Sequence, residues 1–182
     1  LSNTYNYISK SNWSAVLIES DIKKFEGLKN SMSIYEEIYP INSLVGNKGE
    51  SKLDNILQKT PIPKDFDLLS IDVDGNDYAI WEALDEYLPR VVVIEVDSTY
   101  LPNKDYLGST RPDDQSSLFR MTKLALKKKY FLANHIGNAI YIKNEYESKF
   151  WSERPTLDQL FDKSWLPKTF KQKVMHKLFG KF

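Results

Sequence analysis

The segment Leu68–Tyr78, LLSIDVDGNDY, joins a short apolar run to a dense group of carboxylates. Residues 66–73 read as a nearly continuous apolar strand, which is typical of a parallel sheet with both faces covered. Asn76 is expected to cap a helix that runs from Asp77 to Tyr87. The segment therefore predicts a strand that enters a helix through an acidic turn.

The same alternation of strand and helix extends along the chain on both sides of this segment. Amphipathic helical patterns follow the earlier strands, and the last two strands are joined by Gly137-Asn138, which indicates a hairpin. The expected strands are Trp13–Glu19, Ile41–Val45, Phe66–Val73, Val91–Val96, Tyr130–Ile136 and Ala139–Ile142. This order predicts an α/β domain with a mainly parallel sheet.

The composition excludes several classes of protein. A chain of 182 residues is long enough for one domain with a full core. Cysteine is absent, so disulfides and thiolate metal sites are excluded, which agrees with a cytoplasmic location. Lys plus Arg and Asp plus Glu both number 25, so the charge gives no reason to expect a nucleic-acid partner.

Residues 146–182 are expected to form a helical extension of a domain that spans residues 1–145. Apolar residues recur every fourth position at the end of this extension, at Phe170, Val174, Leu178 and Phe182. Five lysines and no acid accompany them from residue 168 onward. This basic tail fits a helix that contacts a membrane surface or a partner, although an ordinary terminal helix packed on the domain is the more common case.

Acidic residues end three of the expected strands. They are Glu19, the pair Asp72 and Asp74, and the pair Glu95 and Asp97. Ligands of open α/β sheets bind at the carboxyl ends of the strands, and an unpaired buried carboxylate costs several kcal/mol. The acids therefore indicate a site. Glu19 fits an acid that binds a ribose diol, or one that helps to cap the following helix.

Several interpretations of the acidic turn compete. A calcium loop is excluded because Gly75 is in the fourth place rather than the sixth. A phosphatase of the haloacid-dehalogenase type would have Thr in place of Asn76, and the acid pair Asp113-Asp114 follows no strand. A sugar-nucleotide transferase would hold a divalent ion between Asp72 and Asp74. The turn could also be purely structural.

Five motifs in order resemble the FkbM-like group of S-adenosylmethionine-dependent methyltransferases. They are LSNTYNYI, WSAVLIESD, DFDLLSIDVDGNDYAIW, VVVIEVDSTYLPN and GNAIYIKN, and together they span roughly residues 1–145. The resemblance implies a Rossmann-like class I methyltransferase sheet with an antiparallel final strand and helices on both faces. It also implies methyl transfer to an oxygen of a glycan, a sugar or another small hydroxylated acceptor.

The resemblance assigns roles to particular residues. Glu19, with Ser20 beside it, would hold the cofactor ribose, and Asp72 and Asp74 would face the methionine end of S-adenosylmethionine. Asp72 would also act in catalysis. Acids of this kind bind Mg²⁺ in related enzymes, which makes Asp74 and Asp97 candidate metal ligands. The expected acceptor-binding residues are Asn76, Asp77, Asp97, Tyr100 and Arg111.

His135 is the candidate catalytic base, because it ends a late strand beside Gly137 and Asn138. A lone histidine is more often structural. Tyr100 and Arg111 belong to the polar loop 98–114, which is either an acceptor-recognition loop or an ordinary surface connection.

The resembling family has one further strand, followed by a Gly-rich turn, before the segment that matches LSNT. We therefore expect the native chain to be longer than this sequence. A chain without that strand would be expected to serve as a non-catalytic interaction domain.

Overall fold

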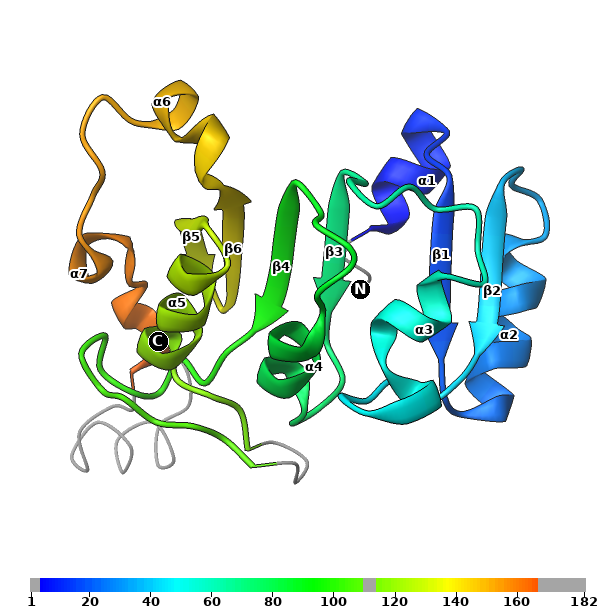
Figure 1. Ribbon diagram of the computed structural model, residues 1–182, viewed down its shortest axis with the longest axis horizontal. Coiled ribbons are helices and arrows are strands. Elements are labelled where there is room, and N and C mark those ends of the chain that lie inside the picture. Colours follow the sequence, from blue (N-terminus) through cyan, green and yellow to red (C-terminus); the bar gives the residue numbers. More distant parts are fainter. Residues whose placement is uncertain (1–3, 110–113, 167–182) are drawn as a thin grey trace, which may run out of the picture.

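The protein is described by a computed structural model over residues 4–109 and 114–166 (Figure 1). The strands are β1 (Ala15–Glu19), β2 (Ile38–Asn42), β3 (Leu68–Ile71), β4 (Val91–Glu95), β5 (Tyr130–Ile136) and β6 (Asn138–Lys143). The helices are α1 (Tyr5–Ser11), α2 (Ile22–Met32), α3 (Leu53–Leu57), α4 (Asp77–Ala83), α5 (Leu118–Lys127), α6 (Glu147–Phe150) and α7 (Leu157–Leu160). The expected alternation of strands and helices is confirmed.

The described strands form two sheets. β1 and β2 pair in parallel, and a second sheet has the order β3-β4-β6-β5. β3 and β4 are parallel, whereas β6 runs antiparallel to both β4 and β5. The arrowheads of β1 to β4 point the same way in Figure 1, so the carboxyl ends of these four strands lie along one edge. The fold is a mixed α/β fold.

β2 begins three residues earlier than the sequence pattern predicted, and it includes Pro40. The expected strand, Ile41–Val45, began after this proline, and proline cannot donate a ladder hydrogen bond. In the structure Pro40 lies opposite Leu17 of β1, and β2 pairs with no other strand of the described chain. An edge strand is where a sheet tolerates proline, so the expected position was wrong.

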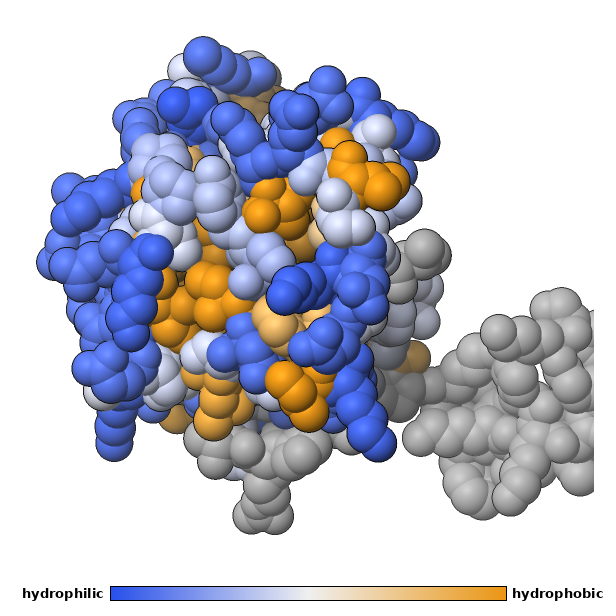
Figure 2. All heavy atoms as spheres, turned by 90° about the vertical axis from the view of Figure 1, so that its right-hand side faces the viewer, coloured by the Kyte–Doolittle hydropathy of each residue, from blue (hydrophilic) through white to orange (hydrophobic). Residues whose placement is uncertain are grey.

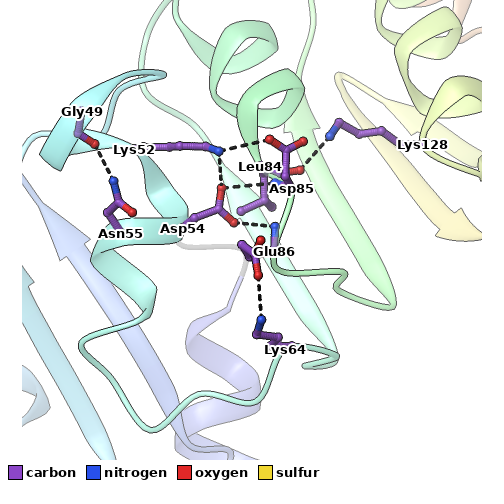
Figure 3. A network of polar contacts seen from close by, with 9 residues as sticks. All are labelled: Gly49, Lys52, Asp54, Asn55, Lys64, Leu84, Asp85, Glu86 and Lys128. Atoms are coloured by element: carbon purple, nitrogen blue, oxygen red, sulfur yellow. Dashed lines mark hydrogen bonds and ion pairs between the residues drawn. The ribbon is translucent and has the colours of Figure 1, made fainter.

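α4 is shorter than predicted, because its last turn is replaced by contacts with α3. Asp54 of α3 accepts hydrogen bonds from the backbone amides of Asp85 (3.2 Å) and Glu86 (2.8 Å) (Figure 3). Lys52 Nζ lies 3.0 Å from the same carboxylate. Burial opposes ionisation of Asp54, but the hydrogen bonds from Lys52 and the two amides outweigh it and lower the pKa. The helix therefore ends at Ala83 instead of Tyr87.

Most of the hydrophobic core is formed by the four-stranded sheet and the helices that pack on it. Trp81 of α4 is 1% exposed and packs against Tyr130 and Tyr141, with ring centroids 5.7 and 5.2 Å apart. Ile94 at the centre of β4 is completely buried. Phe161, which follows α7, is 4% exposed and belongs to the same core. The part of the C-terminal extension up to residue 166 therefore packs on the domain.

The two-stranded sheet has little buried surface by comparison. No residue of β1 or β2 is buried, and Met32 is the one buried residue of α2. Figure 2 views the molecule from this side, where apolar side chains break through a largely polar surface. Ile22, Ile34 and Leu44 expose 57%, 78% and 70% of their side chains.

The basic tail that the sequence predicts from residue 168 onward lies outside the described residues. No helix within residues 4–109 and 114–166 combines the length and the hydropathy that a membrane crossing requires.

Candidate functional site

Three acids meet at the carboxyl ends of β3 and β4. Ile71 of β3 pairs with Ile94 of β4, which places the following residue, Asp72, close to Glu95. One carboxylate oxygen from each of Asp72, Asp74 and Glu95 lies within 4.8 Å of the others. The expectation that acids converge at this edge is confirmed for these three residues.

A buried carboxylate shapes the acidic turn. Asp77 is completely buried and accepts hydrogen bonds from the backbone amides of Val73 and Gly75, both at 3.2 Å. Asp74 and Gly75 have φ angles of 54° and 126°, so the turn needs two left-handed residues in succession. Asp77 was expected to contact the acceptor, but it has no exposed surface and instead holds the loop that presents Asp72 and Asp74.

Asn76 occupies the predicted N-cap position and α4 begins at Asp77 as expected, but the Asn76 side chain makes no capping hydrogen bond. Its Oδ1 is buried and has no hydrogen-bond partner among the described residues. A contact between Asn76 and an acceptor stays a prediction.

Gln115 connects this turn to Glu95. Its Nε2 donates to Asp77 Oδ2 at 2.9 Å and to Glu95 Oε2 at 2.6 Å, and the residue is 5% exposed. Nothing in the sequence pattern indicates this role, because only the fold brings Gln115 to the acids. In the structure α5 begins at Leu118, and Ser117 caps it.

The acids influence one another's protonation. Burial, followed by the nearby negative charges of Asp72 and Asp77, raises the pKa of Glu95. Burial also raises the pKa of Asp77, against the hydrogen bonds that it accepts. In the part of the chain that the structure describes, no ion pair with lysine, arginine or histidine involves Asp72, Asp74 or Glu95.

Three hard oxygen ligands without a basic partner are the donor set that Mg²⁺, Mn²⁺ or Ca²⁺ prefers. Asp74 and Asp97 were the expected metal ligands. Asp97 is not in the cluster: its Oδ1 accepts hydrogen bonds from Thr99 N (2.8 Å) and Thr99 Oγ1 (2.5 Å). Glu95 takes the expected place of Asp97, because it ends the strand beside Asp72.

Glu19 lies in the other, two-stranded sheet. It ends β1, and together with Asp72 it lines a cavity of about 810 Å³ between β1 and β3. Its Oε1 accepts a hydrogen bond from the backbone amide of Asp21 (2.8 Å), which is the cap of α2. Both earlier interpretations of Glu19 are therefore compatible with the structure. Ser20 is exposed, and its carbonyl oxygen accepts a hydrogen bond from Asn42.

Both ring nitrogens of His135, the candidate base, have hydrogen-bond partners inside the protein. It is 2% exposed and stacks on Phe161, with ring centroids 5.1 Å apart. Its Nδ1 accepts a hydrogen bond from the amide of Asp162 (3.1 Å), so the ring proton belongs on Nε2, which lies 2.8 Å from Ser98 Oγ. Burial lowers the pKa of His135. With this tautomer neither ring nitrogen is free to take a proton, so the geometry gives the catalytic role no support, and that role stays a prediction.

The loop after β4 has a small packed centre of its own. Tyr100 packs on Tyr106 with ring centroids 4.8 Å apart, and the Tyr106 hydroxyl donates to Asp114 at 2.7 Å. The hydrogen bond to Asp114, with burial, raises the pKa of Tyr106 to about 12. Arg111 lies outside the described residues, and the proposed part of Tyr100 and Arg111 in acceptor recognition stays a prediction.

No family model, no curated protein and no solved structure matches the chain. The functional conclusion therefore depends on the site itself and on the motifs described above.

Proposed function

We propose that the protein is an S-adenosylmethionine-dependent methyltransferase that acts on an oxygen of a glycan, a sugar or another small hydroxylated acceptor. The observation that carries the proposal is the shared cavity of Glu19 and Asp72, which lie at the carboxyl ends of β1 and β3, two strands that point the same way in the two sheets. The strand order β3-β4-β6-β5, with its antiparallel β6, agrees with the Rossmann-like sheet that the motifs imply.

The residues at the cavity fit the expected cofactor. Glu19 uses Oε1 for the amide of Asp21, and its second oxygen is available to a ribose diol. Asp72 lies on the β3 side of the same cavity, where it would face the methionine end. S-adenosylmethionine supplies the electrophilic methyl group, and the protein has to position the acceptor oxygen in line with it.

The acid cluster would prepare the acceptor. A divalent ion held by Asp72, Asp74 and Glu95 would lower the pKa of an acceptor hydroxyl. This role replaces the one that His135 was expected to play. A carboxylate with a raised pKa, such as Glu95, is also suited to accept a proton near neutral pH.

The same cluster favours a second candidate, a metal-dependent sugar-nucleotide transferase that uses Asp72 and Asp74. A phosphatase of the haloacid-dehalogenase type is less well supported, because Asp114 is engaged by Tyr106 and by the amide of Ser109. A non-catalytic interaction domain is the third candidate, and nothing in the site favours it.

Titration calorimetry with S-adenosylhomocysteine, in the presence and absence of Mn²⁺, tests the proposal. Glu19→Ala and Asp72→Ala should each weaken binding at least about tenfold, which corresponds to about 1.4 kcal/mol. Glu26→Ala, at an exposed position of α2, is the control and should bind as the unmodified protein does. Mn²⁺-dependent binding of a uridine diphosphate sugar, without binding of S-adenosylhomocysteine, would favour the transferase instead.

A further inference from the structure

Four large apolar side chains are exposed around the carboxyl end of β4. Leu101 and Leu107 lie in the loop after β4 and are 57% and 51% exposed. Ile136 ends β5 and is 62% exposed, and Trp165 in the C-terminal segment is 50% exposed. We call these four residues the apolar rim. Single exposed apolar residues are common, whereas a group of them marks a surface that binds a protein or a membrane.

Contacts at the β5–β6 turn bring the parts of the apolar rim together. Ser98, at the start of the loop, donates from Oγ to the carbonyl oxygen of Gly137 at 3.0 Å. The Trp165 indole lies against the same turn, because a Cβ added at Gly137 would be 2.8 Å from Trp165 Cζ2. Asn138, the next residue, pairs with Glu95 at the end of β4. The apolar rim therefore lies beside the edge where the acids meet.

The loop that carries Leu101 and Leu107 is held in place by its own hydrogen bonds. The amide of Ser117 donates to the carbonyl oxygen of Tyr106 at 3.0 Å, and Ser117 also forms a bridge with Asp97, just after β4. Both leucines are thus exposed on a loop that is fixed at its two ends. Their exposure is a property of the folded surface.

The segment that follows the apolar rim is strongly basic. Residues 168–182 contain five lysines and no acid, whereas residues 1–167 contain all 25 acids and the other 20 bases. Trp165 is three residues before this segment, so the lysines begin beside the apolar rim. Aliphatic and tryptophan side chains next to clustered lysines suit an anionic bilayer, where the apolar groups enter the interface and the lysines contact headgroups.

The composition favours a membrane over a protein partner. Protein interfaces are enriched in tyrosine and arginine and depleted in lysine. The apolar rim has two leucines, one isoleucine and one tryptophan, and lysine is the only charged residue type from 168 onward. The acid cluster at the same edge repels anionic headgroups, so the lysines and the apolar rim together have to outweigh it.

We propose that the apolar rim and residues 168–182 attach the protein to an anionic membrane surface. Leu101, Leu107, Ile136 and Trp165 enter the interface, and the lysines bind the anionic headgroups. Attachment through this edge brings the acid cluster close to the bilayer. It requires neither S-adenosylmethionine nor a metal ion, so it holds whether or not the protein transfers methyl groups.

Vesicle sedimentation with the complete 182-residue chain tests the proposal. Vesicles of phosphatidylcholine with about one third phosphatidylserine should bind the protein, and pure phosphatidylcholine should bind it less. The double variant Leu101→Ser/Ile136→Ser should lower the affinity for the anionic vesicles at least about tenfold. Circular dichroism of each variant checks that it folds.

The matched control replaces one isoleucine and one leucine at the opposite edge. Ile34 and Leu88 precede β2 and β4 and are 78% and 51% exposed. Ile34→Ser/Leu88→Ser should change the affinity by less than about twofold. Equal losses in the two double variants, or no binding of the unmodified protein to anionic vesicles, would overturn the proposal. A loss in Lys171→Gln/Lys173→Gln without one in Leu101→Ser/Ile136→Ser would also overturn it, because the apolar rim would then take no part.

A fluorescent label reports directly which surface enters the bilayer. The chain has no cysteine, so Ile136→Cys provides a single attachment point for an environment-sensitive dye. Its emission should move to shorter wavelength when anionic vesicles are added, whereas the same dye on Ile34→Cys should not respond. A shift at both positions, or at neither, would contradict attachment through the apolar rim.

Discussion

The two halves of the molecule have similar strand sequences but very different burial. The β-branched residues of β4 alternate between buried and half-buried positions, and Ile94 is completely buried. The comparable residues of β1, including Ile18, are all half-buried. The difference arises from neighbours, since β4 lies between two strands whereas β1 has one. An apolar run therefore specifies a strand, and the pairing of its two edges determines how much that strand stabilises the fold.

Matched truncations should give the largest contrast between the halves. Ile94→Ala removes completely buried methyl groups and should lower the free energy of unfolding by about 3–4 kcal/mol. Ile18→Ala, in a half-buried position, should cost about 1 kcal/mol. Urea denaturation measures both values. Equal losses would contradict the comparison, because they would mean that β1 is packed as well as β4.

The second prediction concerns the hydrogen bonds that join α3 to the residues after α4. Asp54→Ala leaves the amides of Asp85 and Glu86 without their acceptor and should cost about 2–3 kcal/mol. Exchange of the β1 amides should become faster in the same variant. Glu50→Ala is the control, because the Glu50–Lys59 ion pair is exposed, and it should cost less than about 0.5 kcal/mol.

The contrast also explains which features could be predicted from the sequence. Apolar periodicity identified all six strands, because the pattern depends on burial within a single element. The position of β2 was wrong because an edge strand accepts Pro40, and edge status is a property of the whole sheet. The sequence could not show which residues share an edge.

For the site, too, the sequence predicted the positions of residues along single elements but not the contacts between elements. The sequence placed Asp72 and Asp74 after a strand, and this placement holds. The contribution of Gln115 was missed because an amide bridge between two acids depends on the packing of α5 against the sheet. The environment of His135 was equally hidden, since Phe161 and Asp162 contact it from positions 26 and 27 residues further along the chain.

His135 provides the third prediction, which tests the better-packed half. Its pKa is lowered by burial, so the unfolded chain binds the proton more tightly than the folded one. The stability is therefore complete above the ordinary pKa of about 6.5 and falls as the pH drops below it. His135→Phe should cost about 1–3 kcal/mol at pH 7.5, from the lost hydrogen bonds, and should weaken this pH dependence. Chemical denaturation from pH 5 to 8 measures both effects. An unchanged pH dependence would show that His135 is not the group responsible.

Glu95 should give the smallest effect, and one of opposite sign. Its pKa is raised, so the folded protein binds this proton more tightly, and stability is lost as the pH rises through the raised pKa. Glu95→Gln should therefore increase stability at pH 8 when no divalent ion is present, because it removes a charge that faces Asp72 and Asp77.

Added Mn²⁺ should make the unmodified protein more stable than Glu95→Gln. A bound divalent ion raises the melting temperature in proportion to the logarithm of its concentration above Kd, and its affinity increases with pH as it competes with the proton on Glu95. The unmodified protein should gain stability from Mn²⁺, whereas Glu95→Gln and Asp74→Asn should not. Asp158→Asn changes an exposed acid outside the cluster and is the control. A melting temperature that Mn²⁺ leaves unchanged in the unmodified protein would mean that the three acids repel one another without a resident ion. Their joint placement at the sheet edge would then serve proton transfer by Glu95 alone.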